Sequence, residues 1–351
     1  MKPTQILDRA IKSTDPNSLQ PMLFGELFVK PEDHPSGRSH LSAASGLVRA
    51  GKRWYVIADD ELHLGIFKER SSIVGKSQGL KKGRLFRLLD GALPSNKKRR
   101  KAIKPDFESL MLLPAFGPLS AGVLFAVGSG SKPNRQLGLL IELDQDGKPG
   151  GRKAHVDLTA LYVPLRKQFA DLNIEGAFLS DDSTEFVLLH RGNQGDPRSA
   201  CIRYAWPSIK QWLIEQGQER AQAEEKDQNP IQAPLATAVQ VIPLGSVDGV
   251  PLSFTDGAAL PNAAWVFCAV AEATMDSVQD GACKGSAVGV INQFGEVIYS
   301  RALLGNPKVE GISIESKNDQ WEVTLVTDPD DAEHASQMLK ITLPEVSVPR
   351  R

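Results

Sequence analysis

The chain has 351 residues, of which 41% are hydrophobic and 24% are charged, and its 41 basic and 42 acidic side chains give a net charge of -1. This is the composition of a globular protein with a substantial core, so a disordered or collagen-like chain is excluded. The nearly neutral charge also argues against a protein that grips nucleic acid or an anionic membrane through its overall field.

The ends and the cysteines indicate a cytoplasmic protein. Residues 1–13 lack the apolar run of a secretory signal, and no window approaches the roughly 18 apolar residues of a membrane span. Three cysteines, Cys201, Cys268 and Cys283, have none of the short spacings that bind zinc, and their odd number argues against a disulfide framework.

A strand motif recurs along the chain and predicts a repeat architecture. An acidic residue followed by a small one opens four copies, at Glu108, Glu175, Asp256 and Glu310, and Ser45 opens a fifth copy in which serine replaces the acid. Each opening is followed by turn residues and then by an apolar run typical of a β-strand, with a third and usually a fourth strand beyond it.

The repeat predicts an all-β protein, a single β-propeller of five four-stranded blades around a channel. The expected blades occupy about residues 36–95, 104–160, 172–245, 252–305 and 308–345. The last unit lacks an outer strand, which residues 4–11 can supply, so that the N-terminal strand closes the last blade. The alternative is a sixth blade built from residues 12–35.

Two helices are expected outside the blades. Residues 208–225 are predicted to form a helical insertion in the third blade, in which Ile209, Trp212 and Leu213 make an apolar face that packs on the side of a blade. A second short helix is expected over residues 157–169.

Blade geometry predicts where the polar residues meet. The loop that enters the first strand of a blade lies on the same face as the loop that leaves the second strand. One rim of the channel should therefore gather the four opening acids with the polar residues at the second-strand exits. The candidates at those exits and openings include Asp60, Arg191, Asn193, Glu272, Lys308 and Asp328.

Clustered carboxylates need compensation. Two of them repel by roughly 3 kcal/mol at about 6 Å in an effective dielectric near 20. Calcium, which takes six to eight hard oxygen ligands, would neutralise them, and Glu108, Glu175, Asp256 and Glu310 are the candidate ligands. The alternatives are that the carboxylates are splayed apart in water, that Arg191 and Lys308 neutralise them, or that they hydrogen-bond backbone amides at the strand starts.

Several segments carry a family resemblance. The resemblance rests on residues 45–47, 58–64, 107–109, 173–176, 191–193, 254–256, 308–311 and 326–331. Across residues 40–345 the chain resembles an uncharacterised family of bacterial β-propellers, which is itself distantly similar to the phytase-like and esterase-like propellers. The resemblance implies a propeller with an acidic, calcium-binding channel mouth, and it carries over no assigned activity.

Other signals are weaker. The basic run Lys97–Lys101 is expected in a solvated loop on the same rim, where it could also capture an anionic ligand. His63 and His190 are expected to be hydrogen-bonded core residues, with general acid or base as the alternative. The sequence contains no Gly-rich phosphate loop, G-x-S-x-G elbow or H-E-x-x-H helix.

Together these patterns predict a cation-dependent, hydrolase-like protein that acts on a small anionic molecule, through phosphoester, ester or lactone chemistry. The competing hypothesis is a non-catalytic propeller that binds a metabolite or a protein partner at the channel rim. No nucleic acid or membrane partner is expected.

Overall fold

Five four-stranded antiparallel sheets make up most of the computed structural model, which describes residues 10–12, 15–70, 79–119, 121–221, 231–275, 281–318 and 320–344. Sheets 1 to 5 are numbered in chain order. Sheet 1 contains β3 (Ala44–Ala50), β4 (Arg53–Ala58), β5 (His63–Lys68) and β6 (Arg84–Arg87). Sheet 2 contains β7 (Phe107–Leu113), β8 (Val123–Gly128), β9 (Leu137–Leu143) and β10 (Pro149–Asp157).

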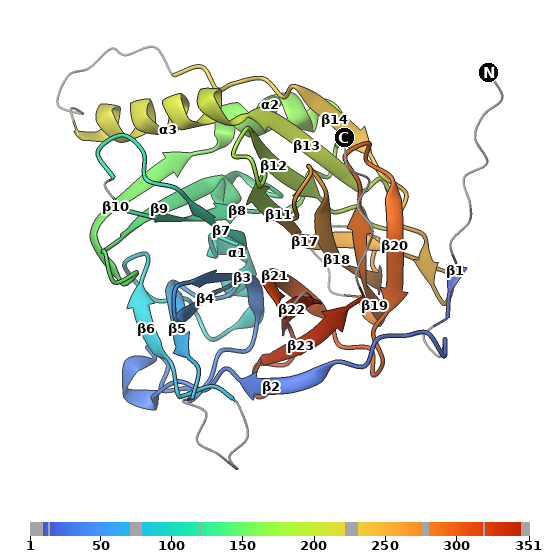
Figure 1. The fold of residues 1–351 in the computed structure, drawn as a ribbon. Helices are drawn as coiled ribbons and strands as arrows, with labels where there is room; N and C mark the ends of the chain where they lie inside the picture. The colour runs from blue at the N-terminus through green and yellow to red at the C-terminus, as the bar shows by residue number, and fades with distance from the viewer. Residues whose placement is uncertain are drawn as a thin grey trace.

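The next two sheets repeat the same order. Sheet 3 contains β11 (Ile174–Leu179), β12 (Glu185–His190), β13 (Ala200–Ala205) and β14 (Ala238–Val241). Sheet 4 contains β17 (Ser253–Ala259), β18 (Trp265–Ala273), β19 (Ala282–Ile291) and β20 (Val297–Ala302). The all-β class predicted from the repeat is confirmed, and the sheets are arranged around a centre as in a propeller (Figure 1).

Sheet 5 joins the two ends of the chain. It contains β21 (Val309–Lys317), β22 (Gln320–Thr327) and β23 (Gln337–Leu343), and its fourth strand is β2 (Met22–Glu26), which pairs antiparallel with β23. The prediction that residues 4–11 fill this place is wrong. Ala10–Ile11 form β1, which pairs with β15 (Ser246–Val247) in a three-stranded sheet with β16 (Val250–Pro251), and residues 4–9 lie outside the described residues.

The segment after residue 12 also does not form a sixth four-stranded sheet, because β2 belongs to sheet 5 and Pro31–Asp33 form a short 3-10 helix. The sequence misled here because residues 4–11 and 22–26 are both short segments with mixed apolar content. Only the packing distinguishes them, since Leu27, directly after β2, is fully buried in a cluster with Trp54 of sheet 1 and Met338 of sheet 5.

The first strands of the five sheets, β3, β7, β11, β17 and β21, contact one another in a closed cycle around the centre. We call them the inner strands. Their backbones approach so closely that a Cβ at Gly46 would lie 2.9 Å from the backbone nitrogen of Leu110, and one at Gly176 would lie 2.8 Å from the Cα of Asp256. Glycine after the opening residue is therefore required by the crowding at the axis.

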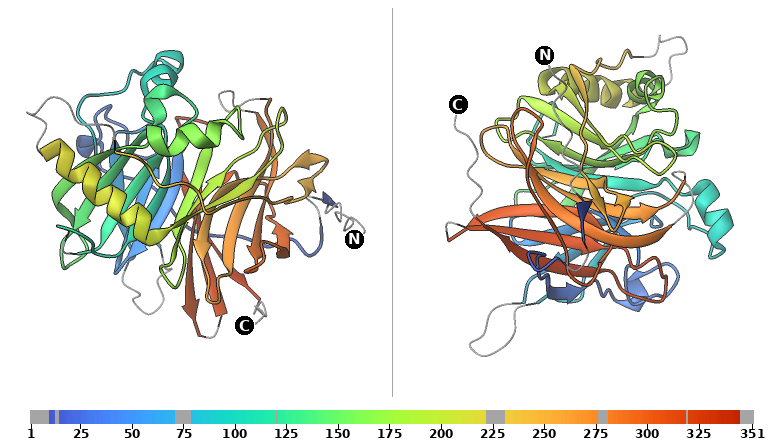
Figure 2. Two further views of the ribbon diagram at one scale, coloured as in Figure 1. Left: turned by 90° about the horizontal axis from the view of Figure 1, so that it is seen from above. Right: turned by 90° about the vertical axis from the view of Figure 1, so that its right-hand side faces the viewer.

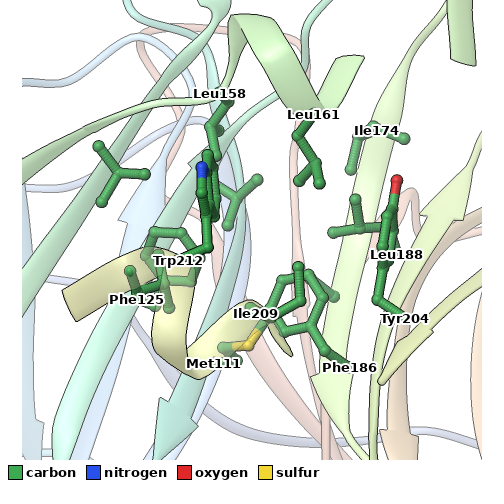
Figure 3. Close-up of a cluster of buried hydrophobic side chains, with 14 of the residues drawn as sticks. Met111, Phe125, Leu158, Leu161, Ile174, Phe186, Leu188, Tyr204, Ile209 and Trp212 are labelled. Atoms are coloured by element: carbon green, nitrogen blue, oxygen red, sulfur yellow. The ribbon is translucent and has the colours of Figure 1, made fainter. Parts of the chain in front are cut away.

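Three helices decorate the sheets, and none in the described residues has the length and apolar content to cross a bilayer. The predicted insertion is α3 (Trp206–Ala221), which contacts β10, β12 and β13, while residues 222–225 of the prediction lie outside the described residues. Ile209 and Trp212 are buried with Phe186 and Leu188 (Figure 3), as the apolar face of the helix predicted. Here α2 (Thr159–Arg166) is the second expected helix.

One helix was not predicted. The basic run forms α1 (Lys97–Ile103), capped by Asn96, whose side chain accepts a hydrogen bond of 3.0 Å from the backbone N–H of Arg99. Figure 2 shows α1 beyond the ends of the strands, whereas α3 lies along the side of the sheets. A run of five like charges disfavours an isolated helix, and the buried Arg135 side chain holds this one by donating a hydrogen bond of 3.0 Å to the carbonyl of Lys101.

Leu27 and Leu23 provide a test of the closure by β2. We expect Leu27→Ala to lower the free energy of unfolding by about 2–5 kcal/mol, because it opens a cavity between sheets 1 and 5. Leu23→Ala, at a position 58% exposed in the same segment, should change it by less than about 1 kcal/mol. Chemical denaturation of both variants checks this, and equal losses would contradict the role assigned to β2 and its flank.

Candidate functional site

A β-bulge interrupts every inner strand at the same place. The pairing register shifts between Ala44 and Gly46, and at four equivalent places in the other sheets. The bulged residues are Ser45, Glu108, Glu175, Thr255 and Glu310. A bulge leaves one residue out of the ladder and redirects its side chain. Three carboxylates and two hydroxyls therefore occupy one ring of equivalent positions.

Asp256 is not part of this ring. It follows the bulge of β17, is only 1% exposed, and accepts backbone N–H hydrogen bonds from Gly257 at 2.8 Å and from Ile312 at 3.0 Å. It links the inner strands of sheets 4 and 5. The sequence pattern aligns Asp256-Gly257 with Glu175-Gly176, but the residue equivalent to Glu175 is Thr255, one position earlier. The structure instead agrees with the alternative in which the acid hydrogen-bonds backbone amides.

The two hydroxyl residues in the ring join neighbouring sheets. Ser45 Oγ donates a hydrogen bond of 2.7 Å to the carbonyl of Phe107, and Thr255 Oγ1 donates one of 2.9 Å to the carbonyl of Val309. Each carbonyl belongs to the residue just before the bulge of the next sheet. An ionised carboxylate cannot donate such a bond, so the three glutamates need other partners.

The glutamates find these partners in a cavity of about 90 Å³ at one end of the channel, which we call the mouth cavity. Its lining contains eight of the ten residues predicted for the site: Glu108, Glu175, Arg191, Asn193, Glu272, Lys308, Glu310 and Asp328. Asp256 is absent from the lining, and Asp60 lines an adjoining cavity of about 180 Å³ instead. Strands of all five sheets or their flanks thus meet at one polar point.

Arg191 is the central cation of the mouth cavity. Its guanidinium lies 3.3 Å from Glu175 Oε2 and 3.7 Å from Glu310 Oε2, and it also donates a hydrogen bond to Glu272. These three carboxylates come from sheets 3, 5 and 4, so one side chain joins three sheets. Only 11% of the Arg191 side chain is exposed, which makes the pairs buried ones.

Lys308 forms the second cluster. Its Nζ lies 2.7 Å from Asp330 Oδ1, 3.5 Å from both Glu310 Oε1 and Asp328 Oδ2, and 3.9 Å from Glu272 Oε2. The sequence-based alternative in which Arg191 and Lys308 neutralise the acids is therefore seen directly in the contacts.

A third cluster was missed by the sequence analysis. Lys104 Nζ lies 2.7 Å from Asp106 Oδ1 and also contacts Asp59, and Arg135 donates a hydrogen bond of 2.8 Å to Asp106 Oδ2. Lys104 and Asp106 lie four and two residues before Glu108, at the entry of an inner strand. That position could have identified them as residues of the same rim. Arg135 lies in the loop between β8 and β9, and nothing in its sequence context marked it.

Glu108 differs from the other glutamates of the ring because no ion pair within 4 Å is seen for it among the described residues. Burial, together with the nearby charges of Glu175 and Asp106, raises the pKa of Glu108 well above its usual range. Carboxylate oxygens of Asp59, Asp106 and Glu108 lie within 4.8 Å of one another, and this is the set that could share a metal ion.

Burial also raises the pKa of two paired acids. The pKa of Glu310 rises to about 8, although Arg191 and Lys308 oppose the shift, and the pKa of Asp328 rises to about 7 despite Lys308. In the adjoining cavity, burial and the charge of Asp59 raise the pKa of Asp60 to about 6. Burial thus favours the neutral form of each of these three acids.

His190 lies beneath the mouth. It is 1% exposed, its ring lies 4.2 Å from that of Phe169, and its Nδ1 lies 3.2 Å from the backbone nitrogen of Asn173. Burial lowers its pKa to about 4. His63 is also buried, and burial lowers its pKa. Neither histidine lines the mouth cavity, so the structure gives both the core position that the sequence favoured.

Comparison with known families places the chain. Residues 40–343 match the family described as "Family of unknown function (DUF6929)". The chain belongs to this family. No curated protein matches the sequence.

Solved structures show only distant likeness. Hydrazine synthase of Kuenenia stuttgartiensis is 11% identical with a TM-score of 0.34, and the match covers 99% of this chain and 67% of that one. A bifunctional GH43-CE protein of Bacteroides eggerthii is 10% identical with a TM-score of 0.43, covering 90% and 34%. The tail fibre of Staphylococcus aureus phage P68 is 10% identical with a TM-score of 0.39, covering 93% and 53%. At TM-scores below 0.5, none assigns a function to this chain.

Arg191 provides a test of the network. We expect Arg191→Gln to lower the free energy of unfolding at pH 7 by about 3–5 kcal/mol, because it leaves three buried carboxylates without their shared cation. The control is Arg198→Gln, which removes a 48% exposed arginine paired with Asp196 and should cost less than about 1 kcal/mol. Similar losses in the two variants, measured by urea denaturation, would contradict the central place of Arg191.

His190 predicts a pH dependence. Since its folded-state pKa is about 4 and its ordinary value is 6.5, the unfolded chain takes up this proton first as the pH falls. The free energy of unfolding should therefore decrease between about pH 6.5 and pH 4. His190→Gln should lose less stability across that window, and denaturation curves at several pH values for both proteins check it. Parallel losses would show that His190 does not contribute.

Proposed function

We propose that the five sheets are the blades of one five-bladed propeller, that β2 closes its last blade, and that the mouth cavity is its functional end. Support comes from the closed cycle of inner strands and from the pairing of β2 with β23. Four of the five bulged residues, Ser45, Glu108, Glu175 and Glu310, line the mouth cavity, so side chains from distant parts of the chain converge there.

We propose further that the mouth binds a divalent cation of the calcium class. The observation that carries this proposal is the set Asp59, Asp106 and Glu108, whose carboxylate oxygens lie within 4.8 Å of one another. Oxygens that share one calcium ion at about 2.3–2.6 Å can be no more than about 5 Å apart, so the set is compact enough. The ligands are thus one acid of the ring and two that the sequence did not select.

Lys104 tests the fit of this set. Its ammonium already contacts Asp59 and Asp106, so a cation has to share these carboxylates with it or displace it. Glu108 is the group with most to gain, because no ion pair within 4 Å is seen for it in the described part of the chain, and burial with the charges of Glu175 and Asp106 outweighs that of Lys104. Glu175 and Glu310, two of the original metal candidates, are already paired with Arg191 and are less suited to the task.

The bound cation would supply Lewis-acid chemistry by polarising an oxygen of an anionic ligand. The residues of the chain would position that ligand. Lys101 and Asn193 line the same cavity, and Arg191 and Lys308 carry positive charge beside it. The lining contains no aromatic or large aliphatic side chain, and a volume of about 90 Å³ suits a small, highly polar group such as a phosphate or carboxylate better than a nucleoside or a sugar.

A second function is favoured by a different observation. Arg191, Lys308 and Lys104 already compensate most carboxylates of the mouth, so the acids do not require a metal. In that case the propeller binds a metabolite or a protein partner at its rim without catalysis. We also propose that the protein is cytoplasmic, that its family is bacterial, and that the family is distantly similar to the phytase-like propellers.

Glu108→Gln is the test of the cation. We expect millimolar calcium to raise the melting temperature of the wild-type protein, because a ligand that binds only the folded state stabilises it by mass action. Glu108→Gln should weaken calcium binding at least tenfold by calorimetry, and Glu175→Gln should weaken it less. Glu333→Gln, which changes an exposed acid, serves as the control and should bind as the wild type does.

A wild-type melting temperature that is the same in EDTA and in calcium, magnesium and manganese would overturn the cation proposal and leave the rim-binding function. Turnover of phosphate esters, lactones and carboxylic esters, measured with and without the cation, then separates the enzyme from the binding protein. Turnover that requires the cation and fails in Glu108→Gln supports the hydrolase.

A further inference from the structure

A separate cavity of about 120 Å³ lies outside the mouth and shares no lining residue with it. It is built from three segments: residues 34–38 ahead of sheet 1, residues 60–63 in the turn between β4 and β5, and residues 91–95 ahead of α1 together with Arg100. Its lining combines Ser36, His34, Glu61 and other polar side chains with the apolar residues Leu62, Leu93 and Pro94, whereas the mouth cavity has no large aliphatic side chain in its lining.

A hydrogen-bonded chain runs through these three residues. Ser36 Oγ lies 3.0 Å from His34 Nδ1, and His34 Nε2 lies 3.0 Å from Glu61 Oε1. The backbone N–H of Ser36 also donates to Nδ1, at 3.2 Å, so this nitrogen is an acceptor and the ring proton is on Nε2. Nε2–H then donates to Glu61, and the Ser36 hydroxyl donates to Nδ1.

The three residues differ in burial: Glu61 and His34 are buried, and Ser36 is exposed. Glu61 is 9% exposed and His34 is 6% exposed, whereas Ser36 is on the surface at the cavity. The carboxylate and the imidazole are thus shielded from water, and the hydroxyl is open to a reagent. A nucleophile joined to a base that a third group orients is the arrangement by which serine hydroxyls are activated.

We propose that Ser36, His34 and Glu61 form a nucleophilic triad that cleaves small carboxylic esters independently of the mouth. Ser36 Oγ attacks the carbonyl carbon while its proton passes to His34 Nδ1, and Glu61 stabilises the imidazolium through Nε2–H. When the ester C–O bond breaks, the proton goes from Nδ1 to the leaving alkoxide. Water then repeats the sequence on the acyl-serine, releasing the acid and restoring the serine.

The cavity also limits the substrate class. Leu62, Leu93 and Pro94 give it an apolar wall, and about 120 Å³ accommodates a short acyl group. Arg38 lines the same cavity two residues after the nucleophile and has no ion-pair partner among the described residues, so its guanidinium is the group available to the oxyanion.

The rate has a structural limit. The Ser36 amide and hydroxyl both donate to one lone pair of Nδ1, so the imidazole is a weaker base towards the hydroxyl than it would be with a single donor. Covalent trapping of the serine is therefore a sharper readout than steady-state turnover.

The test uses an alkyl fluorophosphonate, which transfers its phosphonyl group to an activated serine and releases fluoride, with the adduct located by peptide mass spectrometry. We expect one adduct, on Ser36, in the full-length protein. Ser36→Ala should lose it, and Ser208→Ala, which removes an exposed serine of α3 outside this cavity, should label at the wild-type rate. His34→Gln should label about 100-fold more slowly, the lower end of the contribution of a general base.

A second variant and a second assay keep the result decisive. If His34→Gln fails to fold, Glu61→Gln takes its place in the test. It retains an acceptor for Nε2–H but removes the charge, so it should label at least tenfold more slowly than the wild type. Hydrolysis of a short p-nitrophenyl ester should persist in EDTA and in Glu108→Gln, and should fall in Ser36→Ala. An unlabelled Ser36, or labelling as fast in a folded His34→Gln or Glu61→Gln, would overturn the triad while leaving the cation site untouched.

Discussion

Five backbones converge on one axis in this protein, and the space between them governs the chemistry at the mouth. Inner strands this close leave little room after the bulge, where four of the five positions hold glycine or serine and the fifth, Asp256, accepts a hydrogen bond from the neighbouring inner strand. The bulge removes one residue from the pairing and turns it toward the channel end. In four of the five sheets that residue lines the mouth cavity, and this makes a small polar site from segments as distant in the chain as Ser45 and Glu310.

Electrostatics follows from that convergence. Three glutamates delivered to one place cannot all be charged and unpaired in a buried setting, because desolvation and mutual repulsion both oppose it. The chain answers with Arg191, directly after β12, and Lys308, directly before β21, each contacting acids of more than one sheet. Ion pairs of this kind contribute little net stability when compared with apolar packing, but removing one partner leaves a buried charge without compensation.

The two proposed sites differ in the way the fold constructs them. The mouth needs all five sheets, so its geometry depends on the closure of the ring. The Ser36 cavity needs only sheet 1 and the segments that enter and leave it, and its central contact joins residues two positions apart. Its third member, Glu61, follows the second strand of that sheet, where the turn places it against His34. The geometry of the Ser36 cavity therefore depends less on the closure of the ring than the geometry of the mouth does.

The sequence determined the repeat. A strand that is buried on both faces consists of a continuous apolar run, and the turns between such runs are marked by Gly, Pro, Asn, Asp and Ser, so both are recognised from the sequence alone. It also placed eight of ten site residues at the mouth, since loop positions within a blade are set by the order of its strands.

Tertiary structure decided the rest. Whether residues 4–11 or 22–26 complete sheet 5 depends on packing of Leu27 between two sheets. The register of β17, which puts Thr255 rather than Asp256 in the ring, depends on a one-residue bulge that the pattern of acid and small residue does not resolve. Arg135 joins Lys104 and Asp106, which lie two residues apart between α1 and β7, only because the loop between β8 and β9 packs against that segment, and a contact of that kind leaves no periodic trace in a sequence.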